Sequence, residues 1–271
     1  MSFKEKLSKI VEKNNSLLCV GLDIDKEKMP EFLFSENKNP YLEFNKKIIN
    51  STKDLVCSYK INMAFYETLG LDGYKLLEKT IDFIPKEIPI ILDGKRNDIG
   101  NTAKKYAKSI FEELSVDSAT VNPYLGIDGV RPFLEYSENL SFILCRTSNP
   151  SAKDFQDLKI DKTPLYKMVA RKIKEWNKEF GNCGAVVGAT YPLELKEIRG
   201  ILGENIPLLL PGIGAQGGDV EKTVKYGTNS EGVNAVINSS RGIIYAGSGK
   251  DFYEGSREKA EKLKNKINEF R

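Results

Sequence analysis

The sequence contains no histidine, and its four cysteines include no CxxC pair. These two absences exclude nearly every usual zinc site and every Ser-His or Cys-His nucleophile. Any chemistry must therefore use lysine, arginine, carboxylate, tyrosine, serine or threonine side chains. The four cysteines, Cys19, Cys57, Cys145 and Cys183, are far apart and lie in apolar runs, so we expect all four to be reduced and to pack as small apolar side chains.

Long apolar stretches and an excess of one charge are also missing. The N-terminal segment MSFKEKLSKIVEKNN has no signal-peptide core, and no stretch is long enough to span a bilayer. We therefore expect a cytoplasmic protein with no membrane partner. The 41 basic and 38 acidic residues leave a net charge of only +3, mixed along the chain, so nucleic acid is not expected as a partner either.

Eight short apolar runs rich in Val and Ile recur along the 271 residues. Continuous apolar character over so few residues is typical of strands buried on both faces of a parallel sheet. The runs are SLLCVGLD (16–23), VCSYKIN (56–62), IPIILDGK (88–95), DSATVN (117–122), LSFILCR (140–146), CGAVVGA (183–189), IPLLLPG (206–212) and GVNAVIN (232–238).

Amphipathic segments at 41–55, 74–84 and 102–115 follow the first three runs and have helical patterns. Regular alternation of strand and helix favours a single (β/α)₈ TIM barrel over residues 1–271 rather than two doubly wound halves. The polar connection 147–164 is longer than compact domains usually have, and we expect it to form a lid over the site.

Polar side chains gather at the ends of several of these runs, where (β/α)₈ barrels place their chemistry. They are Asp23 in the first run, Lys60 and Asn62 in the second, Asp93 and Lys95 in the third, Arg146, Thr147 and Ser148 at the fifth, and Arg241 after the eighth. The sequence therefore predicts an active site at that end of the barrel.

The segment LDGKRNDIGNT carries the strongest local signal. Asp93 and Lys95 are two residues apart on a strand, so both side chains face the same side. Asp98 begins the next element and would share a helix face with Thr102. This pattern predicts an ammonium held between carboxylates. Because carboxylates stabilise a charged lysine, we expect Lys95 to act as an acid rather than as a Schiff-base nucleophile.

An isolated Asp-x-Lys pair can also be a structural ion pair at the end of a strand. Lys60 on the neighbouring strand argues against that alternative, because burying two lysines and three carboxylates together is costly without a function.

Two glycine-containing turns are candidates for phosphate binding. In PGIGAQGGD (211–219) the glycines let backbone N–H groups approach an anion, and a helix is expected to begin at Asp219. In INSSRG (237–242) Arg241 can offer a planar fork to phosphate oxygens. Such turns are often simple turn chemistry, but barrels commonly bind phosphate after strands seven and eight.

Together these motifs resemble the orotidine 5′-phosphate decarboxylase family over nearly the whole chain. The chain is similar to the longer-chain, type 2-like members, which have DGKRNDIGNT where others have DLKxxDIxNT. The matching segments are GLD (21–23), YKINMAFYE (59–67), LDGKRNDIGNT (92–102), TSNP (147–150), PGIGAQGGD (211–219) and the Ser240–Arg241 turn. The resemblance implies a carboxy-lyase that converts orotidine 5′-monophosphate to uridine 5′-monophosphate in de novo pyrimidine biosynthesis, with no cofactor and no metal.

The resemblance also implies roles for individual residues. Asp23 and Lys60 would hold the ribose hydroxyls, with Asn62 beside them. Asp93 would lie next to the departing carboxylate, and Lys95 would deliver a proton to C6. No pyridoxal, thiamine or metal site is apparent, so protein electrostatics would stabilise the carbanion.

Other residues are implied by the resemblance to bind substrate from farther away. Asp98, Ile99 and Thr102 would come from the second subunit of a homodimer, with Asp98 joining Lys60, Asp93 and Lys95 in the catalytic set. Ser148 would contact the pyrimidine edge, and Gln216 and Arg241 would hold the phosphate. Gly94 replaces a bulkier residue of the commoner motif, and TSNP leaves open whether Thr147 or Ser148 meets the base.

Two alternatives remain on the same sequence. A magnesium-dependent sugar-phosphate decarboxylase or aldolase would share the DxKxxD motif, but it would need an acidic residue where Lys60 would repel the cation. A non-catalytic nucleotide-binding module would have no need of a lysine between carboxylates that face the ligand.

Overall fold

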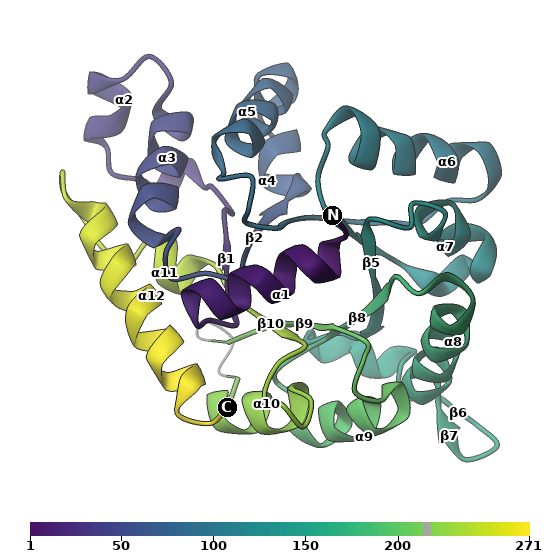
Figure 1. The fold of residues 1–271 in the computed structure, drawn as a ribbon. Helices are drawn as coiled ribbons and strands as arrows, with labels where there is room; N and C mark the ends of the chain where they lie inside the picture. The colour runs from purple at the N-terminus through teal and green to yellow at the C-terminus, as the bar shows by residue number, and fades with distance from the viewer. Residues whose placement is uncertain (214–217) are drawn as a thin grey trace.

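The computed structural model describes residues 1–213 and 218–271, and in them eight parallel strands close into a barrel (Figure 1). Around the barrel the strands follow the order β1-β10-β9-β8-β5-β4-β3-β2. Their bounds are β1 Leu18–Gly21, β2 Ser58–Asn62, β3 Ile90–Arg96, β4 Ser118–Val121, β5 Leu140–Arg146, β8 Cys183–Val187, β9 Leu208–Pro211 and β10 Ala235–Ser239. Each predicted apolar run coincides with one of these strands, which confirms the (β/α)₈ barrel.

Helices surround the strands, as Figure 1 shows. The predicted helices at 41–55, 74–84 and 102–115 are confirmed as α3, α5 and α6, the last continuing into the π-helical turn η2 Ser109–Glu113. No helix in the described part of the chain combines the length and apolar character needed to cross a membrane. The bounds are α1 Phe3–Asn14, α2 Phe32–Glu36, α3 Pro40–Thr52, α4 Met63–Glu67, α5 Gly70–Phe83, α6 Gly100–Lys108, α7 Ile127–Leu134, α8 Leu165–Phe180, α9 Pro192–Leu202, α10 Val220–Gly227, α11 Arg241–Ile244 and α12 Phe252–Asn268, with short 3₁₀ turns η1 Lys26–Lys28, η3 Pro123–Leu125 and η4 Pro150–Asp154.

The strand interiors are fully buried, as expected for a sheet covered on both faces. All four cysteines are buried and form no disulfide. Burial raises the pKa of the Cys19 thiol to about 12, so this thiol is neutral and unreactive. The sequence interpretation of the cysteines as packing residues is confirmed.

Helix α1 covers the end of the barrel at which the strands begin. Lys6 pairs with Asp117, just before β4, over 2.7 Å. The side chain of Asn14 donates a 2.7 Å hydrogen bond to the carbonyl of Val56, just before β2. Because α1 occupies this end, the opposite end, where the strands terminate, is left for a binding site.

The long connection after β5 forms a 3₁₀ turn and a small antiparallel hairpin of β6 Lys159–Ile160 and β7 Thr163–Pro164. Figure 1 shows this hairpin at the outer edge of the molecule, beside α8.

Candidate active site

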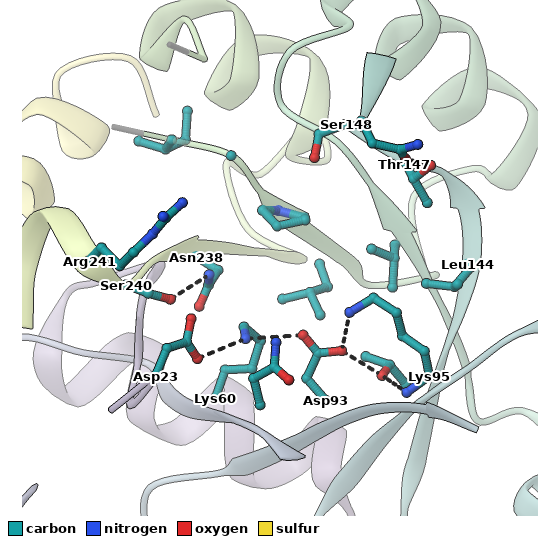
Figure 2. A pocket seen from close by; sticks show the side chains of 18 residues that line it. Asp23, Lys60, Asp93, Lys95, Leu144, Thr147, Ser148, Asn238, Ser240 and Arg241 are labelled. Carbon is teal, nitrogen blue, oxygen red and sulfur yellow. Dashed lines mark hydrogen bonds and ion pairs between the residues drawn. The ribbon is translucent and has the colours of Figure 1, made fainter. Parts of the chain in front are cut away.

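A cavity of about 370 Å³ opens at the carboxyl ends of the strands (Figure 2). Its lining combines charged, polar and apolar residues from strands all around the barrel. They are Asp23, Lys60, Asn62, Asp93, Lys95, Thr120, Leu144, Thr147, Ser148, Asn149, Val186, Leu209, Pro211, Gly212, Ile213, Asn238, Ser240 and Arg241. Seven of the predicted site residues are therefore brought together: Asp23, Lys60, Asn62, Asp93, Lys95, Ser148 and Arg241.

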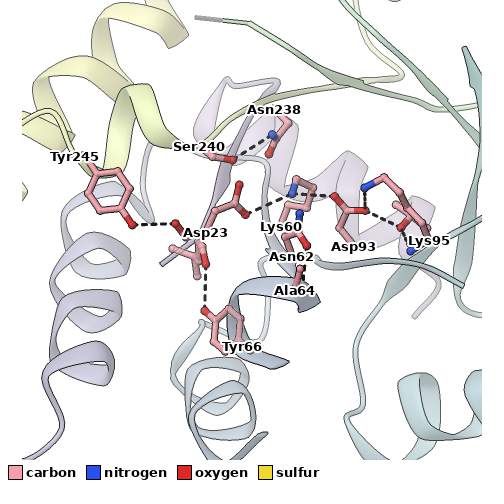
Figure 3. A network of polar contacts seen from close by, with 12 residues as sticks. Asp23, Lys60, Asn62, Ala64, Tyr66, Asp93, Lys95, Asn238, Ser240 and Tyr245 are labelled. Atoms are coloured by element: carbon pink, nitrogen blue, oxygen red, sulfur yellow. Dashed lines mark hydrogen bonds and ion pairs between the residues drawn. The ribbon is translucent and has the colours of Figure 1, made fainter. Parts of the chain in front are cut away.

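Four of these side chains form a row of alternating charge, which Figure 3 shows from close by. Lys60 Nζ lies 3.6 Å from Oδ1 of Asp23 and 3.1 Å from Oδ2 of Asp93. Lys95 Nζ lies 2.8 Å from Oδ1 of Asp93. The carboxylate of Asp93 thus bridges the two ammonium groups. The sequence predicted Lys95 as the ammonium between carboxylates, but among the described residues Lys60 holds that position, and Lys95 pairs with Asp93.

The two central members of the row, Lys60 and Asp93, remain charged although they are buried. Burial opposes ionisation of Asp93, but the ammonium groups of Lys60 and Lys95 outweigh burial and hold the pKa of Asp93 well below its usual range. Burial would lower the pKa of Lys60, but the carboxylates of Asp23 and Asp93 raise it above its usual range. Lys95 differs from Lys60 in being half-exposed, with its ammonium at the cavity. It can therefore reach a ligand while it is paired with Asp93.

The backbone of Lys95 adopts an unusual conformation, with φ at +45°. The pairing of β3 with β4 shifts register between Leu92 and Arg96, so Lys95 lies in an irregular part of the strand. Its N–H group donates a 2.9 Å hydrogen bond to Oγ1 of Thr120, and the same hydroxyl donates over 2.8 Å to Asp93. Left-handed backbone is costly for a residue with a side chain and persists where its surroundings hold it in place.

The sequence did not single out Thr120, nor Asn238 on the other side of the row. Thr120 lies within the predicted run DSATVN, where Ser118 and Thr120 alternate with apolar residues. Period-two alternation of this kind places both hydroxyls on one face of the strand, and that signal could have identified Thr120.

Asp23 is held at the cavity by the chain segments on either side of it. The hydroxyl of Tyr245 donates to the backbone carbonyl of Asp23 over 2.9 Å. A Cβ atom at Gly21 would lie 1.9 Å from Oγ of Ser240, so only glycine lets β1 pass this close to the turn after β10. Oδ1 of Asp23 is buried and accepts no hydrogen bond within the described residues.

The end of the cavity near β10 carries the phosphate-binding candidates. Arg241 begins α11 and lines the cavity near Ser240 and Asn238, which share a 3.4 Å hydrogen bond (Figure 2). Helix α10 begins directly after Asp219, whose side chain accepts from the N–H of Lys222 over 3.1 Å, as predicted. Gln216 lies outside the described residues.

The wall across from the charged row is apolar. It is formed by residues of β5, β8 and β9 and the segment after β9, namely Leu144, Val186, Leu209, Pro211 and Ile213. Strands β1 to β3, which carry the charged row, lie on the other side of the barrel. A planar ring would fit between these two walls, with one face against the apolar side chains. A negatively charged substituent on the ring would then lie at the charged row.

The connection after β5 contributes only its first residues, Thr147, Ser148 and Asn149, to the cavity. Residues 150–164 do not line it and form the outer hairpin instead. Of the segment predicted to form a lid, only its first three residues lie at the cavity in this structure, and the lid stays a prediction. Gln156 links the segment to Thr147 at the rim of the cavity, with 2.9 Å and 2.7 Å hydrogen bonds.

Asp98, Ile99 and Thr102 do not line the cavity of their own chain. Helix α6 begins at Gly100, so Asp98 precedes the helix, and the prediction that it shares a helix face with Thr102 is wrong. Asp98 instead accepts a 2.8 Å hydrogen bond from the N–H of Ile99. The side chain of Ile99 is 53% exposed.

Comparison with known proteins agrees with this geometry. A family model described as "Orotidine 5'-phosphate decarboxylase / HUMPS family" matches residues 16–254. The orotidine 5'-phosphate decarboxylase of Dehalococcoides mccartyi strain BAV1 is 49% identical over 275 residues, covering 100% of this chain and 99% of the relative. That of Cellvibrio japonicus is 47% identical over 274 residues, covering 99% and 98%.

A solved structure, that of Leishmania donovani OMP decarboxylase, superposes with a TM-score of 0.87 at 35% identity, covering 100% of this chain and 99% of that one. The sequence, the barrel and the full-length relatives all agree. The chain belongs to the orotidine 5′-phosphate decarboxylase / HUMPS family.

Proposed function

We propose that this protein is a carboxy-lyase that decarboxylates orotidine 5′-monophosphate to uridine 5′-monophosphate in pyrimidine biosynthesis. The observation that carries the proposal is the row of Asp23, Lys60, Asp93 and Lys95 inside a cavity that also contains Arg241. Curated relatives that match the full chain bear the name of this enzyme.

The order of side chains along the cavity fits the parts of this nucleotide. Arg241 would hold the phosphate through its guanidinium. Asp23, Lys60 and Asn62 would bind the ribose hydroxyls. The pyrimidine would then reach Lys95, with its far edge toward Ser148.

The reaction breaks the bond between C6 and the carboxylate carbon and leaves the electron pair on C6. The ammonium of Lys95 stabilises that charge and donates its proton to C6, giving uridine 5′-monophosphate and carbon dioxide. The resulting neutral amine of Lys95 regains a proton from solvent, which its half-exposed position permits. Asp93 would face the substrate carboxylate and repel it until carbon dioxide leaves.

The phosphate lies far from the reacting atom, so its binding free energy can orient the ring rather than act directly on C6. A substrate that lacks the phosphate should therefore lose turnover as well as affinity.

We also propose a homodimer in which Asp98, Ile99 and Thr102 of one subunit complete the site of the other. These residues do not line their own cavity, and exposed apolar side chains lie near them. Ile99, Tyr124 and Leu125 are all exposed, and a Cβ atom at Gly129 would touch both Leu125 and the carbonyl of Asp98. Exposed apolar residues grouped in this way favour contact with another chain.

Residues 1–271 would act as one barrel domain, because both ends of the chain pack on it. Asn268 in α12 donates a 2.9 Å hydrogen bond to the carbonyl of Asn15, directly after α1. Arg271 donates to the carbonyl of Gly232 over 2.8 Å.

A magnesium-dependent sugar-phosphate reaction fits the geometry less well. Lys60 pairs with both Asp23 and Asp93, so a cation is already present where a metal would need carboxylate ligands. Within the described residues, no group of three or more acidic, cysteine or histidine side chains is placed to hold a metal ion.

A spectroscopic assay of orotidine 5′-monophosphate with the purified protein tests the proposal. We expect the orotate absorbance to decay with multiple turnovers, at the same rate with excess chelator. Loss of activity with chelator would favour the magnesium-dependent reaction. Tight binding of uridine 5′-monophosphate without turnover of the substrate would favour a non-catalytic module.

A further inference from the structure

Arg146, at the end of β5, is a buried cation that the proposed reaction does not use. It is only 2% exposed, and its guanidinium lies 4.2 Å from the ring centroid of Tyr191 and 5.7 Å from that of Tyr166. Its carboxylate partner is Asp157, 3.2 Å away and about half exposed. Burying a guanidinium is costly, and these partners hold it in one position.

The guanidinium fixes the orientation of one amide side chain. Nη1 of Arg146 donates a 3.2 Å hydrogen bond to Oε1 of Gln156. Because a guanidinium only donates, it must face the oxygen of the amide, and the Nε2 group of Gln156 is turned toward Thr147. The long connection after β5 supplies both this glutamine and Asp157, so the connection is joined to the end of β5 through Arg146.

Gln156 forms hydrogen bonds with both the backbone N–H and the side-chain hydroxyl of Thr147. Oε1 of Gln156 accepts a 2.9 Å hydrogen bond from the N–H of Thr147, and Nε2 donates to Oγ1 of Thr147 over 2.7 Å. The same hydroxyl donates to Oδ1 of Asn149 over 2.7 Å. The proton of the Thr147 hydroxyl and one of its acceptor positions are therefore engaged by the protein.

Ser148 is confined from the other side. A Cβ atom at Gly188 would lie 2.9 Å from the backbone of Ser148, so the two chain segments touch. The N–H of Gly188 donates to the carbonyl of Arg146 over 2.8 Å, which fixes that contact. Ser148 thus lies between Gly188 and the hydrogen-bonded Thr147, and lines the cavity.

We propose that Arg146 and Gln156 form a clamp that positions Ser148 to recognise the edge of the pyrimidine, while the hydroxyl of Thr147 is structural. The inference rests on the proposed function, because it assigns the base to this end of the cavity. Arg146 and Gln156 are positioning residues that act through Thr147 and make no contact with substrate.

The test measures binding of three ligands to Gln156→Leu, Thr147→Val and the double variant. The ligands are uridine 5′-monophosphate, cytidine 5′-monophosphate and ribose 5-phosphate, which has no base. Gln156 is only partly buried, so its replacement should leave the fold intact. Lys159→Ala is the matched control, because Lys159 is an exposed residue of the same connection after β5.

Each single variant should bind uridine 5′-monophosphate about tenfold more weakly, equivalent to about 1.4 kcal/mol. The ratio of the affinities for uridine 5′-monophosphate and cytidine 5′-monophosphate should fall as well. The affinity for ribose 5-phosphate should stay within about twofold of the wild-type value. Because the clamp acts through Thr147, the double variant should be no weaker than either single variant. Lys159→Ala should match the wild type in all three affinities.

Equal losses for ribose 5-phosphate and the nucleotide, or additive losses in the double variant, would overturn the clamp. An unchanged preference for uridine over cytidine would also do so. Failure of the proposed function would show itself differently, as a wild-type protein that does not decarboxylate orotidine 5′-monophosphate.

Discussion

The hydroxyl of Thr120 donates a 2.8 Å hydrogen bond to Oδ1 of Asp93, the same oxygen that pairs with the ammonium of Lys95. The oxygen of the same hydroxyl also accepts a hydrogen bond from the backbone N–H of Lys95. One hydroxyl therefore fixes both the carboxylate and the left-handed backbone of the lysine that would donate the proton.

Replacing Thr120 by Val keeps the shape of the side chain and removes both hydrogen bonds. We expect kcat to fall by about tenfold to a hundredfold, because a misplaced catalytic group costs rate more than affinity. KM and the affinity for uridine 5′-monophosphate should change little. Thr120→Ser should restore most of kcat, and a parallel loss of product affinity in Thr120→Val, or no recovery in the serine variant, would contradict a positioning role.

Lys95→Ala should abolish turnover, because the proton donor is lost while Arg241 remains to bind the phosphate. General acid catalysis and electrostatic stabilisation are each worth about a hundredfold or more. Steady-state rates and binding of uridine 5′-monophosphate by titration check this. Exchange of the C6 hydrogen of that product in heavy water should also disappear, since the same lysine would carry the proton in reverse. Substantial residual decarboxylation would exclude Lys95 as the donor.

Arg241→Ala should weaken binding of the phosphorylated substrate more than binding of the nucleoside. Arg241 lies at the far end of the cavity from Lys95, so its effect should reach C6 only through bound phosphate. Turnover of orotidine, which lacks the phosphate, should rise when phosphite is added to the wild type and rise less in the variant. Equal effects of the substitution on both substrates would refute phosphate recognition by Arg241.

The pKa of Asp93, lowered by Lys60 and Lys95 against the effect of burial, predicts a pH dependence of stability. A carboxyl group whose pKa is depressed in the folded state stabilises that state above its unfolded value of about 4, and the contribution is lost as pH falls below it. The free energy of unfolding of the wild type, relative to Asp93→Asn, should therefore decrease as pH is lowered from about 5 to 3. Urea titrations at several pH values measure this, and a constant difference would count against it.

The sequence predicted the barrel well because strands buried on both faces have a simple signature. The runs at 56–62 and 140–146 correspond to β2 and β5 almost residue for residue. The charged side chains at the strand ends were equally visible, since an ionic residue at the end of an apolar run is unusual. Asp23, Lys60, Asp93 and Lys95 are accordingly brought together as predicted.

Features that depend on contacts between distant segments could not be predicted in this way. The alternation of Ser118 and Thr120 can indicate which face the Thr120 hydroxyl lies on, but its hydrogen bond with Lys95 depends on the irregular pairing of β3 with β4. The outer hairpin at 159–164 has no apolar periodicity from which its pairing could be predicted. The contact of Gln156 with the buried Arg146 joins residues ten apart and has no signature in the sequence.

The arrangement of Asp98 and Thr102 in a neighbouring subunit can be tested by mixing two inactive proteins. In a dimer of Lys95→Ala with Asp98→Asn, one site would carry both substitutions, and the other would combine an intact Lys95 with the intact Asp98 of its neighbour. Equal mixing with free exchange makes half of the dimers mixed, so activity should return to about a quarter of the wild-type value. The rise should follow the rate of subunit exchange and be absent when either variant is mixed with itself. If each site used only residues of its own chain, every site in the mixture would keep one substitution, and activity would stay at the average of the two parents.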